Sequence, residues 1–172
     1  YLLPMKKPYV NPASWIVAIV LCGFYFSAAQ AGIITGTVVG IADGDTLTVL
    51  NHDQREIKIR LAEIDAPEKR QAFGTRSKQS LSDLCFGKQA QVVSKVKDRY
   101  KRTVAHVKCS GVDANTEQVK RGMAWVYPRY AKDPDLYVMQ EDAKLARRGL
   151  WIDRSPTPPW EFRKLKRHAS HQ

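Results

Sequence analysis

The stretch from Ile34 to Leu61 reads ITGTVVGIADGDTLTVLNHDQREIKIRL, and it decides the fold. β-Branched residues gather in three runs, which predict strands at Thr37–Val39, Thr46–Leu50 and Ile57–Leu61. Asp43-Gly44 and Asn51-His52-Asp53 are turn signals between these runs. Because both connections are short, we expect the three strands to form an antiparallel meander.

The third predicted strand has two faces of different polarity. Lys58 and Arg60 alternate with Ile57, Ile59 and Leu61, so one face of the strand is apolar and the other polar. The remaining chain predicts two further strands and three helices, at about 91–96 and 103–107, and at about 77–86, 115–122 and 135–148. Asn115 is the expected N-cap of the second helix. The predicted fold class is therefore α+β, a five-stranded OB-like β-barrel with three helices.

The chain divides into three predicted parts. Residues 1–31 read as a signal peptide, residues 32–155 as one folded domain, and residues 156–172 as a Pro-rich, basic C-terminal tail. Pro156, Pro158 and Pro159 open that tail, so we expect it not to be helical.

Export is indicated by the first part of the chain. Lys6 and Lys7 precede the apolar run Trp15–Phe26, and Ala29-Gln30-Ala31 offers a small-x-small cleavage pattern. We expect cleavage after Ala31, which leaves a secreted or periplasmic protein without membrane attachment. An uncleaved membrane anchor is the alternative interpretation.

Two cysteines remain after that cleavage, Cys85 and Cys109. An oxidising compartment favours a disulfide between them. The alternative is a thiol nucleophile or a metal ligand, but the chain has no CxxC motif and no Cys/His cluster.

The net charge is +11, and it stays at +9 without Lys6 and Lys7. Such an excess favours polyanionic partners, namely nucleic acid, anionic membranes or acidic glycans. A merely soluble basic protein is the plainer explanation of the charge.

Carboxylates gather around the meander. Asp43 and Asp45 flank Gly44, while Asp65 and Glu68 follow the third strand. Adjacent antiparallel strands bring Asp45 and Asp65 to one end of the predicted barrel. Two carboxylates, a backbone carbonyl and waters form a hard-oxygen site suited to Ca²⁺. A single Asp in this context is more often only a turn residue.

Two arginines complete the pattern. Arg60 lies on the polar face of the third strand, and Arg102 ends the connection before the fifth strand. The planar guanidinium group suits bidentate phosphate binding, and two of them neutralise charge that develops on a phosphodiester. Glu68 is then the candidate base that deprotonates an attacking water.

At this point the chain resembles the staphylococcal nuclease (thermonuclease) family. The resemblance is carried by Ile41–Thr46 (IADGDT), Ile59–Glu68 (IRLAEIDAPE), Asp98–Arg102 (DRYKR) and Glu117–Tyr127 (EQVKRGMAWVY). It implies that Asp45, Asp65 and the carbonyl of Ala66 bind Ca²⁺. It also implies that Glu68 is the general base and that Arg60 and Arg102 hold the scissile phosphate.

Two positions depart from the family pattern. Ala66 stands where the family has Thr, and Lys101 stands where a Gly precedes the second arginine. A Gly at such a position can supply a special backbone angle. Tyr127 and Tyr130 are the candidates for stacking on a nucleotide base, with core packing as the alternative.

The resemblance and the residues together predict an exported, Ca²⁺-dependent nuclease. It hydrolyses DNA and RNA with little sequence specificity and leaves 3′-phosphates, and it acts as a monomer without a stable protein partner. The alternatives are a non-catalytic nucleic-acid-binding OB module and a basic protein that binds membranes. The membrane alternative is weakened because no basic amphipathic helix is predicted in the mature domain.

Overall fold

A computed structural model describes residues 33–170, except for the side chains of residues 94 and 95. The predicted signal peptide, the alternative membrane anchor and the cleavage point after Ala31 lie outside the described residues. Within the described part of the chain, every helix is too short or too polar to cross a bilayer.

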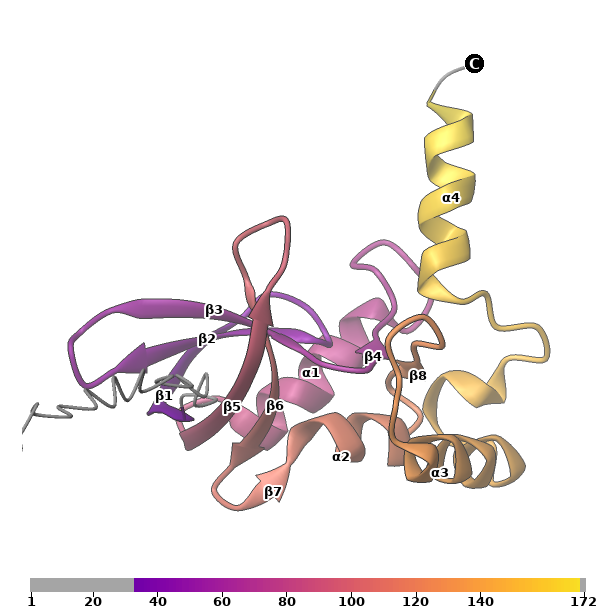
Figure 1. Cartoon of the computed structure of the whole chain (residues 1–172). Helices are drawn as coiled ribbons and strands as arrows, with labels where there is room; N and C mark the ends of the chain where they lie inside the picture. Colours follow the sequence, from indigo (N-terminus) through magenta and orange to yellow (C-terminus); the bar gives the residue numbers. More distant parts are fainter. Residues whose placement is uncertain (1–32, 171–172) are drawn as a thin grey trace, which may run out of the picture.

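Five strands form a closed barrel, as predicted (Figure 1). They are β1 (Ile33–Ile41), β2 (Thr46–Asn51), β3 (Glu56–Leu61), β5 (Gln89–Lys97) and β6 (Thr103–Cys109). The order is β3-β2-β1-β5-β6, and parallel pairing of β3 with β6 closes the barrel. The short β7 (Val112–Asp113) extends the β6 edge.

Alternation of side chains fills the barrel. On β6, Thr103, Ala105 and Val107 are buried while their neighbours lie closer to solvent. The antiparallel meander of β1, β2 and β3 agrees with the sequence prediction. The parallel closure was not anticipated, because a local pattern does not specify which distant strand is the partner.

The three predicted helices are α1 (Gly74–Cys85), α2 (Ala114–Lys120) and α3 (Pro134–Leu145). The predicted N-cap of α2 is wrong. Asp113 caps the helix by accepting a hydrogen bond from the Thr116 N–H at 2.8 Å. Asn115 is instead fully buried, and its amide bonds the Val107 N–H and the Ala62 carbonyl. Asp113 and Asn115 can both cap a helix. Because the Asn115 side chain is bonded to the barrel, Asp113 is the residue that caps α2.

A disulfide joins Cys85 at the end of α1 to Cys109 at the end of β6. The two residues are 24 positions apart in the sequence. The bond therefore fixes the far end of α1 against the barrel.

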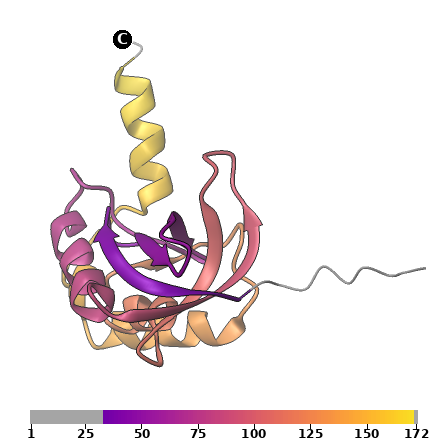
Figure 2. The same cartoon turned by 90° about the vertical axis from the view of Figure 1, so that its left-hand side faces the viewer.

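The tail corrects the sequence prediction most clearly, because α4 (Pro159–Ala169) is helical. Pro158 is the N-cap, and Pro159 occupies the first helical turn, where no N–H partner is needed. The prolines therefore start this helix rather than prevent it. After the 3-10 turn η1 (Gly149–Ile152), the chain crosses to α4. Figures 1 and 2 show α4 projecting on the same side as the tip of the β5–β6 hairpin, away from α3.

Candidate active site

The acidic turn between β1 and β2 is held from two helices. The Asp43 carboxylate accepts a hydrogen bond from the Asp45 N–H at 3.0 Å. A Cβ atom at Gly44 would collide with the Ser77 hydroxyl of α1. The Gly44 carbonyl accepts a 2.7 Å bond from Gln118 of α2. Helix packing therefore requires glycine here and sets the position of Asp45.

Arg60 joins the two predicted aspartates. Its Nη2 lies 2.8 Å from Asp65 Oδ1 and 3.4 Å from Asp45 Oδ2. Its Nη1 donates to the carbonyl oxygens of Leu61 and Ile64 at 3.1 and 3.0 Å. The guanidinium group is thus fixed against the main chain as well as against both carboxylates.

The strand β4 (Ile64–Asp65) pairs with β8 (Trp125–Val126) beside the barrel. Asp65 is only 1% exposed. The Ala66 N–H donates to Asp45 Oδ2 at 3.0 Å, so the segment after β4 closes on the start of β2. Asp45, Arg60, Asp65 and Ala66 are therefore gathered at one end of the barrel.

The charges in this cluster perturb one another. Burial and the neighbouring Asp45 carboxylate raise the pKa of Asp43 to about 6. Burial also raises the pKa of Asp65, although hydrogen bonding to Arg163 opposes that rise. Burial lowers the pKa of Arg60, but Asp45 and Asp65 together outweigh this effect and raise it. The cluster is rich in negative charge, and cations stabilise it.

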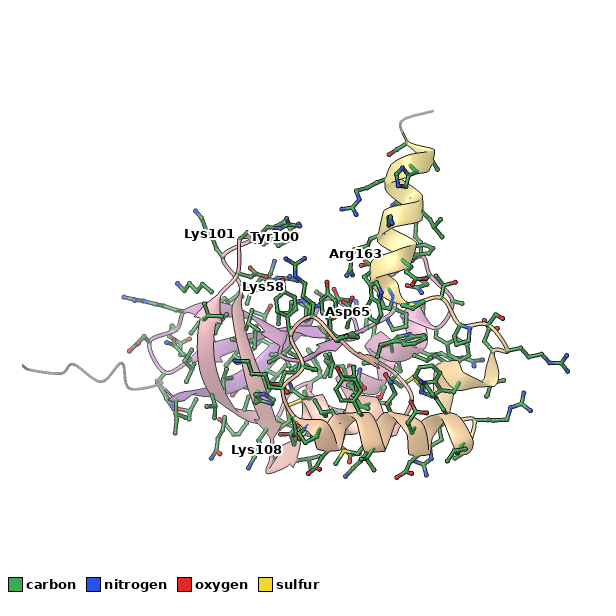
Figure 3. The ribbon with its side chains drawn as sticks, turned by 45° about the vertical axis from the view of Figure 1, so that its right-hand side comes forward. Lys58, Asp65, Tyr100, Lys101, Lys108 and Arg163 are labelled. Carbon is green, nitrogen blue, oxygen red and sulfur yellow. A yellow bond between two sulfur atoms is a disulfide. The ribbon has the colours of Figure 1, made fainter. Side chains whose placement is uncertain are left out.

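Arg163 of α4 supplies a second guanidinium group to the cluster. Its Nη2 lies 2.6 Å from Asp65 Oδ2, and its Nη1 lies 2.7 Å from Glu68 Oε1. Burial lowers the pKa of Arg163, but the hydrogen bonds to Asp65 and Glu68 outweigh burial, and the pKa is raised. Figure 3 shows Arg163 reaching from α4 toward Asp65. Glu68, the predicted base, and Asp65 therefore accept hydrogen bonds from the same guanidinium group.

Arg102 reaches the cluster through a hydroxyl group. Its Nη1 lies 3.4 Å from Thr46 Oγ1, which in turn donates to Asp45 Oδ1 at 2.9 Å. Its Nη2 and Nε contact Asp98 Oδ2 at 2.8 and 2.9 Å. Lys101 adopts a left-handed φ of 63°, the backbone angle for which a glycine would be suited. The hairpin keeps its shape with lysine, and Arg102 is directed toward the site.

The two predicted stacking tyrosines differ in their surroundings. Tyr127 stacks on Trp160 of α4, with ring centroids 5.3 Å apart and planes 8° apart. Tyr130 packs edge-on against Tyr127 and is 56% exposed. Tyr127 follows β8, and its N–H donates to the Glu63 carbonyl at 2.8 Å. Tyr127 thus lies at the base of α4, with Tyr130 packed against it.

Oxygen atoms dominate the donors available to a metal ion. The Asp45 and Asp65 carboxylates lie together, and the predicted third donor is a carbonyl. Within residues 33–170, no three side chains of His, Cys, Asp or Glu converge as a ligand cluster. An ion here would need main-chain carbonyl groups and water besides the two aspartates, a donor set that Ca²⁺ accepts. The residues present fit calcium better than zinc, which prefers nitrogen and sulfur.

Sequence reasoning missed two contributors. Arg163 was noted only as part of a basic tail, because the prolines were interpreted as excluding a helix. Gln118 lies in α2 and bonds the Gly44 carbonyl, the Ser77 carbonyl and the Ser80 hydroxyl. A polar residue on the inner face of a short helix was the available signal for Gln118.

Comparison with known proteins agrees with this geometry. Residues 58–153 match the family model described as staphylococcal nuclease homologue. An uncharacterized endonuclease of Haemophilus influenzae is 44% identical over 92% of this chain and 89% of its own length. A micrococcal nuclease of Shigella flexneri is 41% identical over 79% of this chain and 84% of its own length. The staphylococcal-like nuclease CAN1 of Arabidopsis thaliana is 35% identical over 66% of this chain and 35% of its own length.

The matched region contains Arg60, Asp65, Glu68 and Arg102, and the similarity to the first two relatives extends over most of both chains. The chain therefore belongs to the staphylococcal nuclease family and is a hydrolase of the endonuclease type, with nucleic acid as its substrate.

Proposed function

We propose that this nuclease depends on Ca²⁺ held by Asp45, Asp65 and the carbonyl of Ala66. The observation that carries the proposal is the position of Arg60, which contacts both aspartates at 3.4 and 2.8 Å. A phosphate at this point would meet a guanidinium group and the two carboxylates that hold the cation. Bound calcium would supply positive charge to the phosphate oxygens.

The side chains around that point have distinct roles. Glu68 accepts the proton of the attacking water, since its carboxylate and that of Asp65 are bridged by one guanidinium group, Arg163. Arg60 and Arg102 bind the non-bridging oxygens, and both are already held in place by carboxylates and hydroxyls. Preorganised donors of this kind act where negative charge develops in the transition state.

The substrates are DNA and RNA, and the products carry 3′-phosphates. Recognition through phosphate contacts carries no sequence information, so we expect slight sequence specificity. Tyr130, with its exposed ring, offers a face for an unstacked base. This arrangement favours single-stranded or otherwise accessible substrate.

The protein is proposed to be exported and to act as a monomer. Support for export comes from the apolar run and small-x-small pattern before Gly32, together with the disulfide between Cys85 and Cys109. Membrane attachment through an uncleaved segment is the alternative. N-terminal sequencing of protein recovered outside the cytoplasm distinguishes the two.

The test incubates the purified protein with plasmid DNA, single-stranded DNA and RNA, each with Ca²⁺ or with excess EGTA. We expect cleavage only with Ca²⁺. The 3′ ends of the fragments should not ligate to the 5′ end of an adaptor until a 3′-phosphatase has removed their phosphates. Equal cleavage in EGTA, or ligatable 3′ ends without phosphatase, contradicts the proposal.

A further inference from the structure

The helix α4 stands beside the active site although it lies outside the region matched by the family model, residues 58–153. The part of α4 from Pro159 to Arg163 is packed on the domain. Pro159 is buried, Trp160 stacks on Tyr127, and the Gln71 side chain bonds the Thr157 carbonyl at 2.5 Å. From Lys164 onward the helix is exposed. It is therefore anchored at its base and free along its length.

The face of α4 that is turned toward the site can be identified from one contact. Arg163 reaches Asp65 and Glu68 at 2.6 and 2.7 Å, so its side of the helix faces the site. Positions three and four residues further on share that side. These are Lys166 and Arg167, both exposed. Three cationic side chains thus follow the site-facing side over one helical turn, a rise of about 6 Å.

A second group of basic side chains lies across the site from those of α4. The β5–β6 hairpin carries Arg99, Lys101 and Arg102, and its tip projects on the same side of the molecule as α4 (Figures 1 and 2). Figure 3 shows Lys101 and Tyr100 on the hairpin and Arg163 on α4, with Asp65 low between them. The scissile position therefore lies between two cationic projections, an arrangement that suits an extended polyanion.

We propose that the side of α4 formed by Arg163, Lys166 and Arg167 is a phosphate-binding surface for a single nucleic-acid strand. The strand runs from the hairpin across the cleavage site and along this helix. The inference extends the proposed nuclease function and rests on it for the identity of the ligand. Arg163 exchanges its contact with Asp65 and Glu68 for a phosphate when the strand enters.

Aromatic side chains at the base of α4 favour a single strand over a duplex. Tyr127 and Trp160 form a stacked pair, and Tyr130, 56% exposed, lies edge-on to it. Unpaired bases stack on such rings, whereas bases inside a duplex present no free face. On the exposed length of α4, Leu165 is an isolated apolar side chain, which disfavours insertion into a membrane.

The test uses Lys166→Gln/Arg167→Gln, which leaves Arg163 and the anchored turn intact. A matched control, Lys108→Gln/Lys120→Gln, removes the same charge from β6 and α2. Lys108 is labelled in Figure 3 on the opposite side from α4. Binding of a labelled single-stranded DNA oligonucleotide is followed by fluorescence anisotropy in EDTA over a series of KCl concentrations.

Each phosphate contact to a single strand contributes about 0.7 to the slope of log K against log salt. The α4 variant should therefore lose about 1.4 from that slope and bind roughly 25-fold more weakly near 0.1 M salt. The control should keep the wild-type slope. Lys166→Arg/Arg167→Lys, which retains both charges, should restore binding.

Three results overturn the inference. One is an unchanged slope in the α4 variant, and another is an equal loss in the control. The third is wild-type binding by the α4 variant together with tighter binding by Arg163→Gln, which would make α4 only a plug on the site. Cleavage of the oligonucleotide in EDTA would instead contradict the proposed calcium dependence, and early anisotropy readings would still report the slope.

Discussion

Replacing Asp43 with Asn removes one negative charge from the acidic turn and keeps its hydrogen-bond acceptor. Asp43 Oδ1 accepts the Asp45 N–H at 3.0 Å, and the amide oxygen of Asn can accept the same bond. The turn therefore retains its shape while the repulsion between Asp43 and Asp45 disappears. Comparing the variant with wild type therefore measures how much the Asp43 charge lowers the unfolding free energy.

The pKa shift sets the size of this cost. The pKa of Asp43 is raised from 3.8 to about 6 by burial and by Asp45. Since one pKa unit corresponds to about 1.4 kcal/mol, the shift costs at most about 3 kcal/mol once Asp43 is charged. The native state holds the proton more tightly than the unfolded state. The contribution of protonated Asp43 to the unfolding free energy of the wild type is therefore complete below about pH 4. It is lost as the pH rises through about 6.

The measurement is urea denaturation in EDTA, followed by tryptophan fluorescence between pH 4 and pH 7.5. The difference in unfolding free energy between Asp43→Asn and wild type should be near zero at the acidic end. It should grow to between about 1 and 3 kcal/mol at neutral pH, in favour of the variant. Saturating Ca²⁺ should shrink the difference, because a divalent cation beside Asp45 favours the charged form of Asp43. A difference that does not vary with pH would refute this account of the turn.

Other predictions follow from the same geometry. Arg60→Lys keeps the charge but loses the planar fork, in which Nη2 contacts both Asp45 and Asp65 while Nη1 is held by two main-chain carbonyls. Its kcat/KM should therefore fall by about 100-fold with an unchanged circular dichroism spectrum. Cys85→Ala/Cys109→Ala opens a loop of 24 residues, which should lower the unfolding free energy by about 3 kcal/mol and Tm by on the order of 10 °C. An unchanged Tm in calorimetry would contradict that loop argument. Gly44→Ala places a Cβ against the Ser77 hydroxyl, and should destabilise by about 2 kcal/mol in the same assay.

The barrel was predictable because each of its strands has a recognisable local sequence pattern. The alternation of Lys58 and Arg60 with apolar neighbours assigns the face of β3, and the two turns assign the order of β1 to β3. The gathering of Asp45, Arg60 and Asp65 follows from that order. Pairing of β3 with β6 does not follow, since it joins segments that are far apart in the sequence and have similar patterns.

The contribution of α4 was not predictable from its composition. Proline excludes a helix only where a preceding turn needs its N–H, and Pro159 stands before any such turn. Whether a basic helix then docks depends on tertiary contacts such as Trp160 on Tyr127 and Arg163 on Glu68. The sequence contains these residues, but nothing local pairs them. The missed N-cap at Asp113 has a similar origin, since burial of Asn115 decides it.

The most direct test of the proposed site is the single-turnover cleavage rate of Glu68→Gln with saturating Ca²⁺ and saturating substrate. The amide keeps the size of the side chain but cannot accept a proton from water. A matched control is Glu161→Gln, which neutralises an exposed carboxylate in the first turn of α4. We expect a 10²- to 10⁴-fold slower rate for Glu68→Gln, with DNA binding retained, and a wild-type rate for the control. A rate for Glu68→Gln within a few fold of wild type would contradict this expectation.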